Sequence, residues 1–175
     1  ADAAGRAVSF IQSNYEGFGS GIVIDGTGIA MQNRGAGFVL DEGHVNSLRP
    51  GARPYHTIIP GFMTKDGRPL LSFGVMGGDF QPQGHAQVLM NMIDFGMSPQ
   101  QAGEQARVAH SESSKPTGVK STGPGTVHLE RGISDSVRDQ LTQMGHHLSS
   151  NVGAFGGYQS IWRMDDPLRY FGGSD

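Results

Sequence analysis

The stretch from Pro69 to Asp79, with the sequence PLLSFGVMGGD, decides how the rest of the chain is interpreted. It is mostly apolar, as in a buried strand, until it reaches the glycine pair Gly77–Gly78. The preceding turn, Lys65–Arg68, predicts a hairpin whose first arm is Phe62–Thr64. After the glycine pair the period changes, and apolar residues recur at helical spacing from Val88 to Ile93. We therefore expect a strand to run into the glycine pair and a helix to follow it.

The glycine pair can be interpreted in two ways from the residues alone. Consecutive glycine N–H groups between a strand and a helix can point at one small anion, because no Cβ blocks the approach. The pair is then an oxyanion hole for the tetrahedral intermediate of acyl transfer. The alternative is a purely structural turn between the strand and the helix.

Shorter patterns predict the remaining elements. A buried strand is expected over Arg6–Ser13, and the turn Asp25–Gly28 between two apolar runs predicts another hairpin. Residues 35–60 are rich in turn residues and form a long predicted loop. Gly96 is expected to end the first helix, and the further elements are helices after Ser98 and Ser134 and strands at Val127–Leu129 and Ser160–Arg163. Strands and helices are thus segregated along the chain, which predicts an α+β fold.

The composition fits one globular domain over residues 1–175. Of the 175 residues, 36% are hydrophobic and 17% are charged, which is enough apolar material for a core. The 28 glycines are about twice the usual share and indicate many tight turns. The net charge is −3 and no run of Lys or Arg occurs, so neither a nucleic acid nor an anionic membrane is an expected partner. No apolar run approaches the roughly 20 residues of a membrane span.

The cysteine and histidine content excludes several chemistries. Without cysteine, the chain has no disulfide, no cysteine-ligated zinc and no cysteine nucleophile. The compartment stays undecided, with the cytoplasm slightly favoured over the periplasm or secretion. The seven histidines are scattered without an H-E-x-x-H motif, so no metal site is expected. Neither a G-x-S-x-G elbow nor a phosphate-binding loop occurs, and no pair of nucleophile and base can be assembled.

Several blocks, taken in their order along the chain, resemble the small subunit of γ-glutamyltransferases, which are N-terminal-nucleophile hydrolases. These blocks are Asp2–Ser9, Phe18–Val23, Gly28–Arg34, Pro50–Pro54, Gly74–Asp79, Gln81–His85 and Gly173–Asp175. The resemblance spans essentially the whole chain and depends on the joint order and spacing of the blocks. It implies a four-layer αββα sandwich, of which this chain supplies a part.

The resemblance also implies the origin of the nucleophile. In that family a precursor cleaves itself and exposes a threonine, whose hydroxyl attacks a γ-glutamyl amide while its own α-amine serves as the base. Alignment on Asp2–Gly5 places this threonine about six residues upstream of Ala1. Because the chain opens with Ala1 rather than Met and stops at Gly172–Asp175, the sequence is also expected to be trimmed at both ends. A polypeptide that begins at Ala1 would lack this threonine and is expected to be inactive. The implied partners are the large subunit from the same precursor and a small-molecule amide substrate, with no cofactor.

The catalytic residues that the resemblance implies are Ser13, Gly77 and Gly78. Ser13 matches the hydroxyl residue that hydrogen-bonds the catalytic threonine, and the alternative is an ordinary strand serine. Gly77 and Gly78 match the glycines whose N–H groups stabilise the oxyanion. For the glycine pair the resemblance thus favours the oxyanion hole over the structural turn.

The implied substrate-binding residues depart from the family pattern. Thr57 matches the second of two serines that hold the substrate's α-carboxylate, and His56 replaces the first. Asn33 and Arg34 are also expected to bind the substrate. However, Arg34 and Gly37 stand where the family has an amide or acidic residue and an aspartate that grip the α-amino group. Without that aspartate a glutamyl ammonium loses its partner, whereas Arg34 favours an anionic group.

Three functions stay open at this point. The first is γ-glutamyl transfer or hydrolysis, for example on glutathione. The second, within the same family, is hydrolysis of a non-glutamyl acyl amide, such as a glutaryl amide, a cephalosporin amide or oxamate. The third is a non-catalytic binding or structural subunit that lacks the nucleophile.

Overall fold

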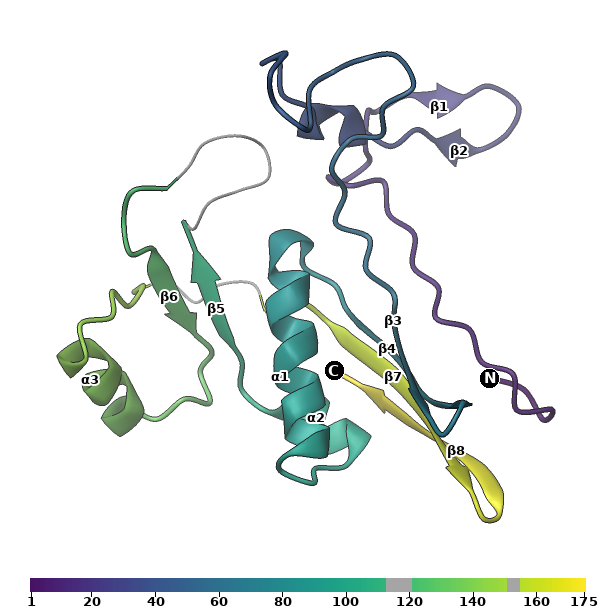
Figure 1. Cartoon of the computed structure of the whole chain (residues 1–175), viewed down its shortest axis with the longest axis vertical. Coiled ribbons are helices and arrows are strands. Elements are labelled where there is room, and N and C mark those ends of the chain that lie inside the picture. Colours follow the sequence, from purple (N-terminus) through teal and green to yellow (C-terminus); the bar gives the residue numbers. More distant parts are fainter. Residues whose placement is uncertain (113–120, 151–154) are drawn as a thin grey trace. The chain divides into compact units, whose positions relative to one another are not determined.

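Figure 1 shows the computed structural model of the chain, which describes residues 1–112, 121–150 and 155–175. The chain divides into two compact units. Unit 1 consists of Ala1–Ile11, Ile59–Ser111 and Gly125–Asp175, and unit 2 consists of Gln12–Ile58 and Glu112–Pro124. The single domain predicted from the composition stays a prediction.

Unit 1 contains a four-stranded antiparallel sheet with the strand order β3-β4-β7-β8. Its strands are β3 (Gly61–Lys65), β4 (Arg68–Val75), β7 (Tyr158–Asp165) and β8 (Leu168–Ser174). The predicted hairpin before the glycine pair is confirmed, because β3 and β4 pair through a turn in which Asp66 and Gly67 both have positive φ. β7 confirms the strand predicted at Ser160–Arg163, and β8, which was not predicted, pairs with it.

Two helices, α1 (Gln81–Ile93) and α2 (Pro99–Glu104), pack against this sheet. Together they bury the core of unit 1, which includes Leu71, Phe73, Val75, Val88, Met92, Ala102 and Tyr158. α2 begins as predicted, because Ser98 Oγ accepts from the Gln101 N–H (3.3 Å) and the Gln101 side chain accepts from the Ser98 N–H (3.0 Å). Gly96, with φ +66°, lies in the connection between the two helices.

The first segment of unit 1 is extended but forms no strand, so the strand predicted over Arg6–Ser13 is wrong. Val8 and Phe10 are 72% and 78% exposed, and no described strand pairs with their backbone. Hydroxyl groups attach the segment to β4 instead: Ser9 Oγ donates to the Phe73 carbonyl (3.3 Å), and Ser72 Oγ donates to the Val8 carbonyl (3.1 Å). The apolar pattern predicted the extended backbone, but a strand also needs a paired neighbour.

A second antiparallel pair of strands in unit 1 consists of β5 (Val108–Ser111) and β6 (Thr126–Leu129), and β6 contains the strand predicted at Val127–Leu129. Two glutamines of α1 bind the backbone of β5 in the manner of a neighbouring strand. The side-chain amides of Gln83 and Gln87 each exchange two hydrogen bonds with alternate residues of β5, at 2.7–3.0 Å. The helix and this pair of strands are thereby tied together.

The described residues of unit 2 form little regular structure. β1 (Val23–Ile24) and β2 (Ile29–Ala30) form the hairpin predicted around Asp25–Gly28. A short 3₁₀ turn, η1 (Arg34–Gly37), follows. From there to Ile58 the backbone is irregular, as the predicted loop requires.

The order of the elements confirms the α+β class. The last helix, α3 (Asp135–Gln143), follows Ser134 as predicted, although the Ser134 side chain makes no capping hydrogen bond. One sheet with α1 and α2 against it is the part of the predicted αββα sandwich that unit 1 contains (Figure 1). None of the described helices is long and apolar enough to cross a membrane.

Candidate active site

The glycine pair lies in the turn between β4 and α1. Gly77 has φ +135° and Gly78 has φ +58°, values that residues with side chains rarely adopt. The ladder between β4 and β7 ends before the pair, where the Met76 N–H donates to the Gly157 carbonyl (3.0 Å), and the 3₁₀ turn η2 (Gly78–Phe80) leads into α1. Both glycines are exposed, and within the described residues neither N–H donates to a protein acceptor. The two N–H groups are therefore available to a ligand, as an oxyanion hole requires.

Side chains complete the backbone hydrogen bonds of β4 next to this turn. β3 pairs with β4 only as far as Gly61–Phe73. At Phe73 the carbonyl accepts from Ser9 Oγ (3.3 Å), and further along the Val75 N–H donates to His85 Nε2 (3.1 Å). The end of β4 is thus held by the N-terminal segment and by α1, while the glycine N–H groups stay uncovered.

The loop residues 155–157, directly before β7, support the glycine pair from another side. A Cβ on Gly77 would lie 3.4 Å from Gly156 Cα, and Gly156 itself has φ +72°. Arg107, which is 2% exposed, donates to the carbonyls of Phe155 (2.6 Å) and Gly156 (3.3 Å) and forms an ion pair with Asp175. Burial lowers the pKa of the Arg107 guanidinium. A buried cation therefore fixes the loop on which the turn rests.

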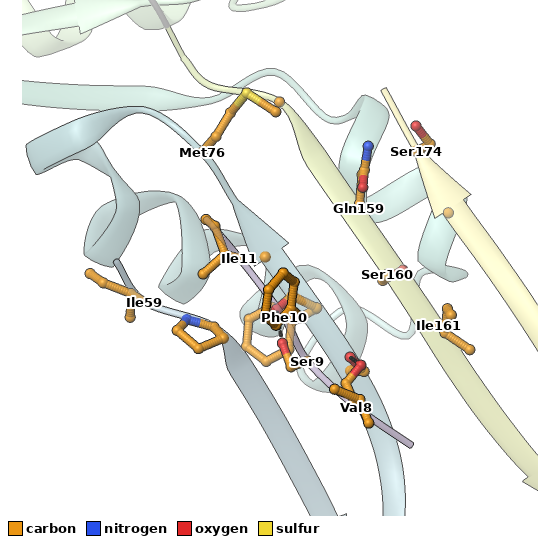
Figure 2. A pocket seen from close by; sticks show the side chains of 16 residues that line it. Val8, Ser9, Phe10, Ile11, Ile59, Met76, Gln159, Ser160, Ile161 and Ser174 are labelled. Carbon is orange, nitrogen blue, oxygen red and sulfur yellow. Dashed lines mark hydrogen bonds between the residues drawn. The ribbon is translucent and has the colours of Figure 1, made fainter. Parts of the chain in front are cut away.

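A cavity of about 520 Å³ lies beside the turn in unit 1. It is lined by Val8–Ile11 of the N-terminal segment and by β4, β7 and β8, and it includes Met76 and Gly157. Figure 2 shows Met76 at one end of this cavity and Val8 at the other. Gly77 and Gly78 follow Met76 directly but are not part of the lining. The segment that leads upstream, toward the nucleophile that the resemblance implies, thus forms one wall of the cavity.

In unit 2, Arg34 is buried, with 8% of its surface exposed. Its Nη1 donates to Thr57 Oγ1 (3.3 Å), and its guanidinium lies over the Tyr15 ring at 5.2 Å from the centroid. Its Nη2 has no hydrogen-bond partner, and no carboxylate of the described residues forms an ion pair with it. A buried cation without a counter-charge is costly, so the arrangement of Arg34 and Thr57 is suited to receive an anion.

The other predicted residues of unit 2 make local hydrogen bonds. The exposed residues Ser13 and His56 each accept a hydrogen bond from the N–H two residues ahead, through Oγ (2.9 Å) and Nδ1 (3.2 Å) respectively. Asn33 Oδ1 accepts from the Glu16 N–H (3.1 Å), and Gly37 is buried without a side chain that could hold an ammonium. The structure thus brings Arg34 and Thr57 together, and the catalytic and binding roles of all these residues stay predictions.

Three residues that were not predicted as part of the site support these arrangements, namely Ser9, Tyr15 and His85. His85 has a signal in the sequence, because it lies at helical spacing with the other buried residues of α1, which are Gln81, Gly84, Val88 and Met92. Ser9 lies in the stretch interpreted as a strand, where a serine has no distinguishing pattern. Tyr15 adopts φ +80°, which is uncommon for a residue with a side chain and has no signature in the sequence.

The remaining chemistry of the described residues is limited. They contain no group of three or more His, Asp or Glu side chains that could hold a metal ion. Burial raises the pKa of Tyr158, whose hydroxyl donates to Ser160 Oγ (2.6 Å), and burial lowers the pKa of His85. Both side chains are therefore neutral near pH 7. The groups suited to an anion are the glycine N–H pair of unit 1 and the Arg34 guanidinium of unit 2.

Comparison with known proteins places the chain in a family. The family model described as gamma-glutamyltranspeptidase matches residues 1–175, so the chain belongs to this family and the resemblance is confirmed. Over 106 residues it is 49% identical to a glutathione hydrolase-like YwrD proenzyme of Bacillus subtilis, a match that covers 61% of the chain and 20% of that protein. Over 101 residues it is 46% identical to an oxamate amidohydrolase proenzyme of Klebsiella pneumoniae, covering 58% of the chain and 19% of that protein. The chain thus matches about a fifth of the length of these relatives.

Solved structures agree with this assignment. A cephalosporin acylase from Bacillus halodurans superimposes with a TM-score of 0.81 and 47% identity, over 94% of this chain and 29% of that one. A gamma-glutamyltranspeptidase from Pseudomonas nitroreducens superimposes with a TM-score of 0.81 and 26% identity, over 99% of this chain and 91% of that one. The fold of this chain is therefore that of the corresponding region in both proteins.

Proposed function

We propose that the protein containing this chain is an amidohydrolase of the gamma-glutamyltranspeptidase family that cleaves amides whose acyl group carries a carboxylate. The observation that carries the proposal is the buried guanidinium of Arg34, which has a free Nη2 and no described carboxylate partner beside Thr57. A substrate carboxylate would supply the missing counter-charge through two parallel hydrogen bonds.

The chemistry follows from the nucleophile that the family resemblance implies. The hydroxyl of a threonine upstream of Ala1 attacks the amide carbonyl carbon, and its proton passes to the threonine's own α-amine. Negative charge builds up on the carbonyl oxygen, where the N–H groups of Gly77 and Gly78 stabilise it. The C–N bond then breaks, the amine leaves with the proton, and the acyl group stays on the threonine as an ester. Water attacks this ester, releases the acid and restores the hydroxyl, while Ser13 orients the threonine.

The nature of the acyl group follows from Arg34 and Gly37. An α-amino group on the acyl chain would need a carboxylate near Arg34, and Gly37 provides none. Amides whose acyl group lacks an α-amine, such as oxamate or a glutaryl amide, therefore fit this chain best. The names of two relatives, an oxamate amidohydrolase and a cephalosporin acylase, support this choice. The γ-glutamyl amides are the second candidate, because the chain is also 49% identical to a glutathione hydrolase-like protein.

We further propose that this chain is the small subunit of a processed precursor and that the large subunit is its partner. Both curated relatives are named proenzymes, which supports processing. The region that this chain matches makes up 91% of the solved Pseudomonas chain but only 29% of the Bacillus halodurans chain, which fits a region that can exist as a separate polypeptide.

The test uses the full-length precursor after processing. Oxamate, glutaryl-p-nitroanilide and γ-glutamyl-p-nitroanilide are compared as substrates in one assay. Arg34→Met is compared with Arg49→Met, a change of an exposed arginine in the same unit. Loss of a charge-assisted hydrogen bond is worth about 1.5–3 kcal/mol, so Arg34→Met should raise KM between about 10-fold and 150-fold. Arg49→Met should leave KM unchanged.

The results discriminate between the two candidate classes of substrate. Preferred cleavage of oxamate or the glutaryl amide, with the KM effect confined to Arg34→Met, supports the proposal. A clear preference for the γ-glutamyl amide would contradict the inference from Gly37 and favour the second candidate. An unchanged KM in Arg34→Met would remove Arg34 from the site.

A further inference from the structure

His85 lies on the buried face of α1, directly against β4. Gly84 permits this approach, because a Cβ there would lie 2.8 Å from both Val75 Cγ1 and Phe80 Cε1. The centroid of the His85 ring is 5.0 Å from that of Phe73, and its Nε2 lies 3.1 Å from the Val75 backbone nitrogen. Only 9% of His85 is exposed. The imidazole is therefore a buried acceptor for the backbone of β4.

The Val75 N–H depends on this acceptor. β7 does not supply an acceptor, because the N–H groups of β4 alternate between its two edges and the next one, that of Met76, points to β7 and donates to the Gly157 carbonyl (3.0 Å). On the other edge β3 pairs with β4 no further than Phe73, and Val75 is 0% exposed, so neither a described strand nor bulk water replaces the imidazole. Because an N–H can only donate, Nε2 must present its lone pair, and the imidazole is neutral with its proton on Nδ1. A buried N–H left without a partner would destabilise the end of β4.

Val75 is separated from the glycine pair by Met76 alone. We propose that His85 is a positioning residue for Gly77–Gly78, which fixes the end of β4 and thereby the direction of the two glycine N–H groups. The catalytic meaning of this inference rests on the proposed function, whereas the contact with Val75 does not. His85 touches neither the threonine nor the substrate in this proposal and acts only through the backbone.

The contact also makes the turn sensitive to pH. An imidazolium has two donors and no lone pair, so protonated His85 cannot accept from the Val75 N–H. The elements packed against α1 carry Arg68 on β4, Asp79 on η2, Glu104 on α2 and His110 on β5. None of these described groups contributes to the shift, and burial alone lowers the pKa of His85 from its ordinary value of about 6.5.

Because burial lowers the pKa of His85, acid weakens the contact. The folded chain binds the His85 proton less readily than the unfolded chain does. The contact therefore contributes its full stability above about pH 6.5 and loses it as the pH falls toward the lowered pKa. We expect the glycine pair to lose its fixed direction in the same acid range.

The test compares two variants of His85 in the full-length, processed protein with glutaryl-p-nitroanilide as substrate. His85→Leu removes the acceptor, whereas His85→Gln supplies an amide oxygen that accepts but does not titrate. His146→Gln, which changes an exposed histidine after α3, is the matched control. Removing one oxyanion donor outright lowers kcat about 100-fold to 1000-fold. Displacing it through His85→Leu should lower kcat between about 10-fold and 100-fold with KM almost unchanged. His85→Gln should retain most of kcat and flatten the acid limb of the pH profile.

A second measurement separates this inference from the proposed function. Protection of the Val75 amide against hydrogen exchange reports the contact whether or not any amide substrate is cleaved. Protection should fall at least about tenfold in His85→Leu, and in the wild type at pH 5 relative to pH 7.5, but not in His85→Gln. If the wild type cleaves no amide but Val75 behaves in this way, the proposed function fails and the contact stands. Wild-type kcat together with wild-type Val75 protection in His85→Leu would overturn the inference.

If His85→Leu does not fold, a comparison without this variant still tests the inference. The comparison then uses the wild type and His85→Gln across pH 5–8. A flattened acid limb and a protected Val75 amide at pH 5 in His85→Gln support the inference. Identical pH profiles and identical Val75 protection in the two proteins would overturn it.

Discussion

Arg107 provides a quantitative test of how the loop behind the glycine pair is held. Its guanidinium is 2% exposed and donates to the carbonyls of Gly103 (2.8 Å), Phe155 (2.6 Å) and Gly156 (3.3 Å). It also forms an ion pair with Asp175. The substitution Arg107→Met keeps an apolar stem of similar length but removes the charge and every one of these hydrogen bonds.

The expected cost follows from burial. Breaking a buried ion pair by removing one partner costs about 3–5 kcal/mol, because the remaining charge and acceptors lose their partner. The Asp175 side chain is 24% exposed, so water can reach its carboxylate, and we expect the lower end of the range, about 3 kcal/mol. At 1.4 kcal/mol for each factor of ten, this corresponds to a loss of protection of about 100-fold.

The assay is native-state hydrogen exchange of the full-length protein, followed at the amides of β7 and β8. Arg138→Met is the matched control, because Arg138 also donates to three backbone carbonyls at 2.7–3.3 Å but is only half-buried. Arg138 forms no ion pair with the described residues. Its loss should cost about 1 kcal/mol in the amides around α3, or less than about tenfold in protection. Equal losses in the two variants would refute the argument from burial and charge.

Three further predictions concern unit 1. Ser98→Ala should destabilise α2 by about 1 kcal/mol, because Ser98 forms a capping hydrogen bond. Ser134→Ala should have almost no effect, because the Ser134 side chain forms no such bond. Equal urea-unfolding midpoints of the two variants would contradict this difference. Gln87→Leu should lower the free energy of unfolding by about 1–3 kcal/mol, because the side chain loses its two hydrogen bonds to the Val108 backbone (both 2.8 Å). Gln140→Leu, at an exposed position of α3, is the control and should leave the free energy of unfolding unchanged. Tyr170→Phe removes the hydrogen bond from the Tyr170 hydroxyl to the Asp2 carbonyl (2.7 Å) and should raise the exchange rate of the Gly5 amide about threefold to tenfold; an unchanged rate would mean that Tyr170 does not hold the N-terminal turn.

The parts of the fold that could be predicted are those whose signals are local. The hairpin of β3 and β4 has a turn at Asp66–Gly67 between apolar runs, and α1 and α2 have helical spacing and a capping serine. The strand β8 (Leu168–Ser174) was missed because its arginine and glycines give no strand pattern, and its conformation follows from pairing with β7. The reverse holds for Arg6–Ser13, where the strand pattern is present and the paired neighbour is not.

The same distinction applies to the candidate site. Gly77 and Gly78 could be identified because two glycines between a strand and a helix indicate a backbone conformation that other residues rarely adopt. Their positive φ values agree with that interpretation. Arg34 and Thr57 lie 23 residues apart, and only the family resemblance connected them before the structure did. The contact of His85 with Val75 could not be predicted from the sequence for a different reason. Helical spacing predicts that His85 is buried, but the missing β3 partner that makes Val75 need an acceptor is a property of the sheet.

The two anion-binding features bear on whether the chain belongs to a catalyst or to a subunit without catalytic function. The buried guanidinium of Arg34, which has no counter-charge among the described residues, reduces the stability of the folded chain, and the glycine pair leaves two exposed N–H groups without a protein acceptor. A structural role would be served better by an apolar residue at Arg34 and by a turn whose N–H groups are paired. Polar or charged groups that lack a protein partner and bring no structural benefit are typical of functional sites, where the ligand supplies the missing hydrogen-bond acceptor or counter-charge. Both features offer donors to negative charge, one to a carboxylate and the other to an oxyanion. Their joint presence in one chain therefore weighs against the non-catalytic subunit and supports the proposal of an amidohydrolase.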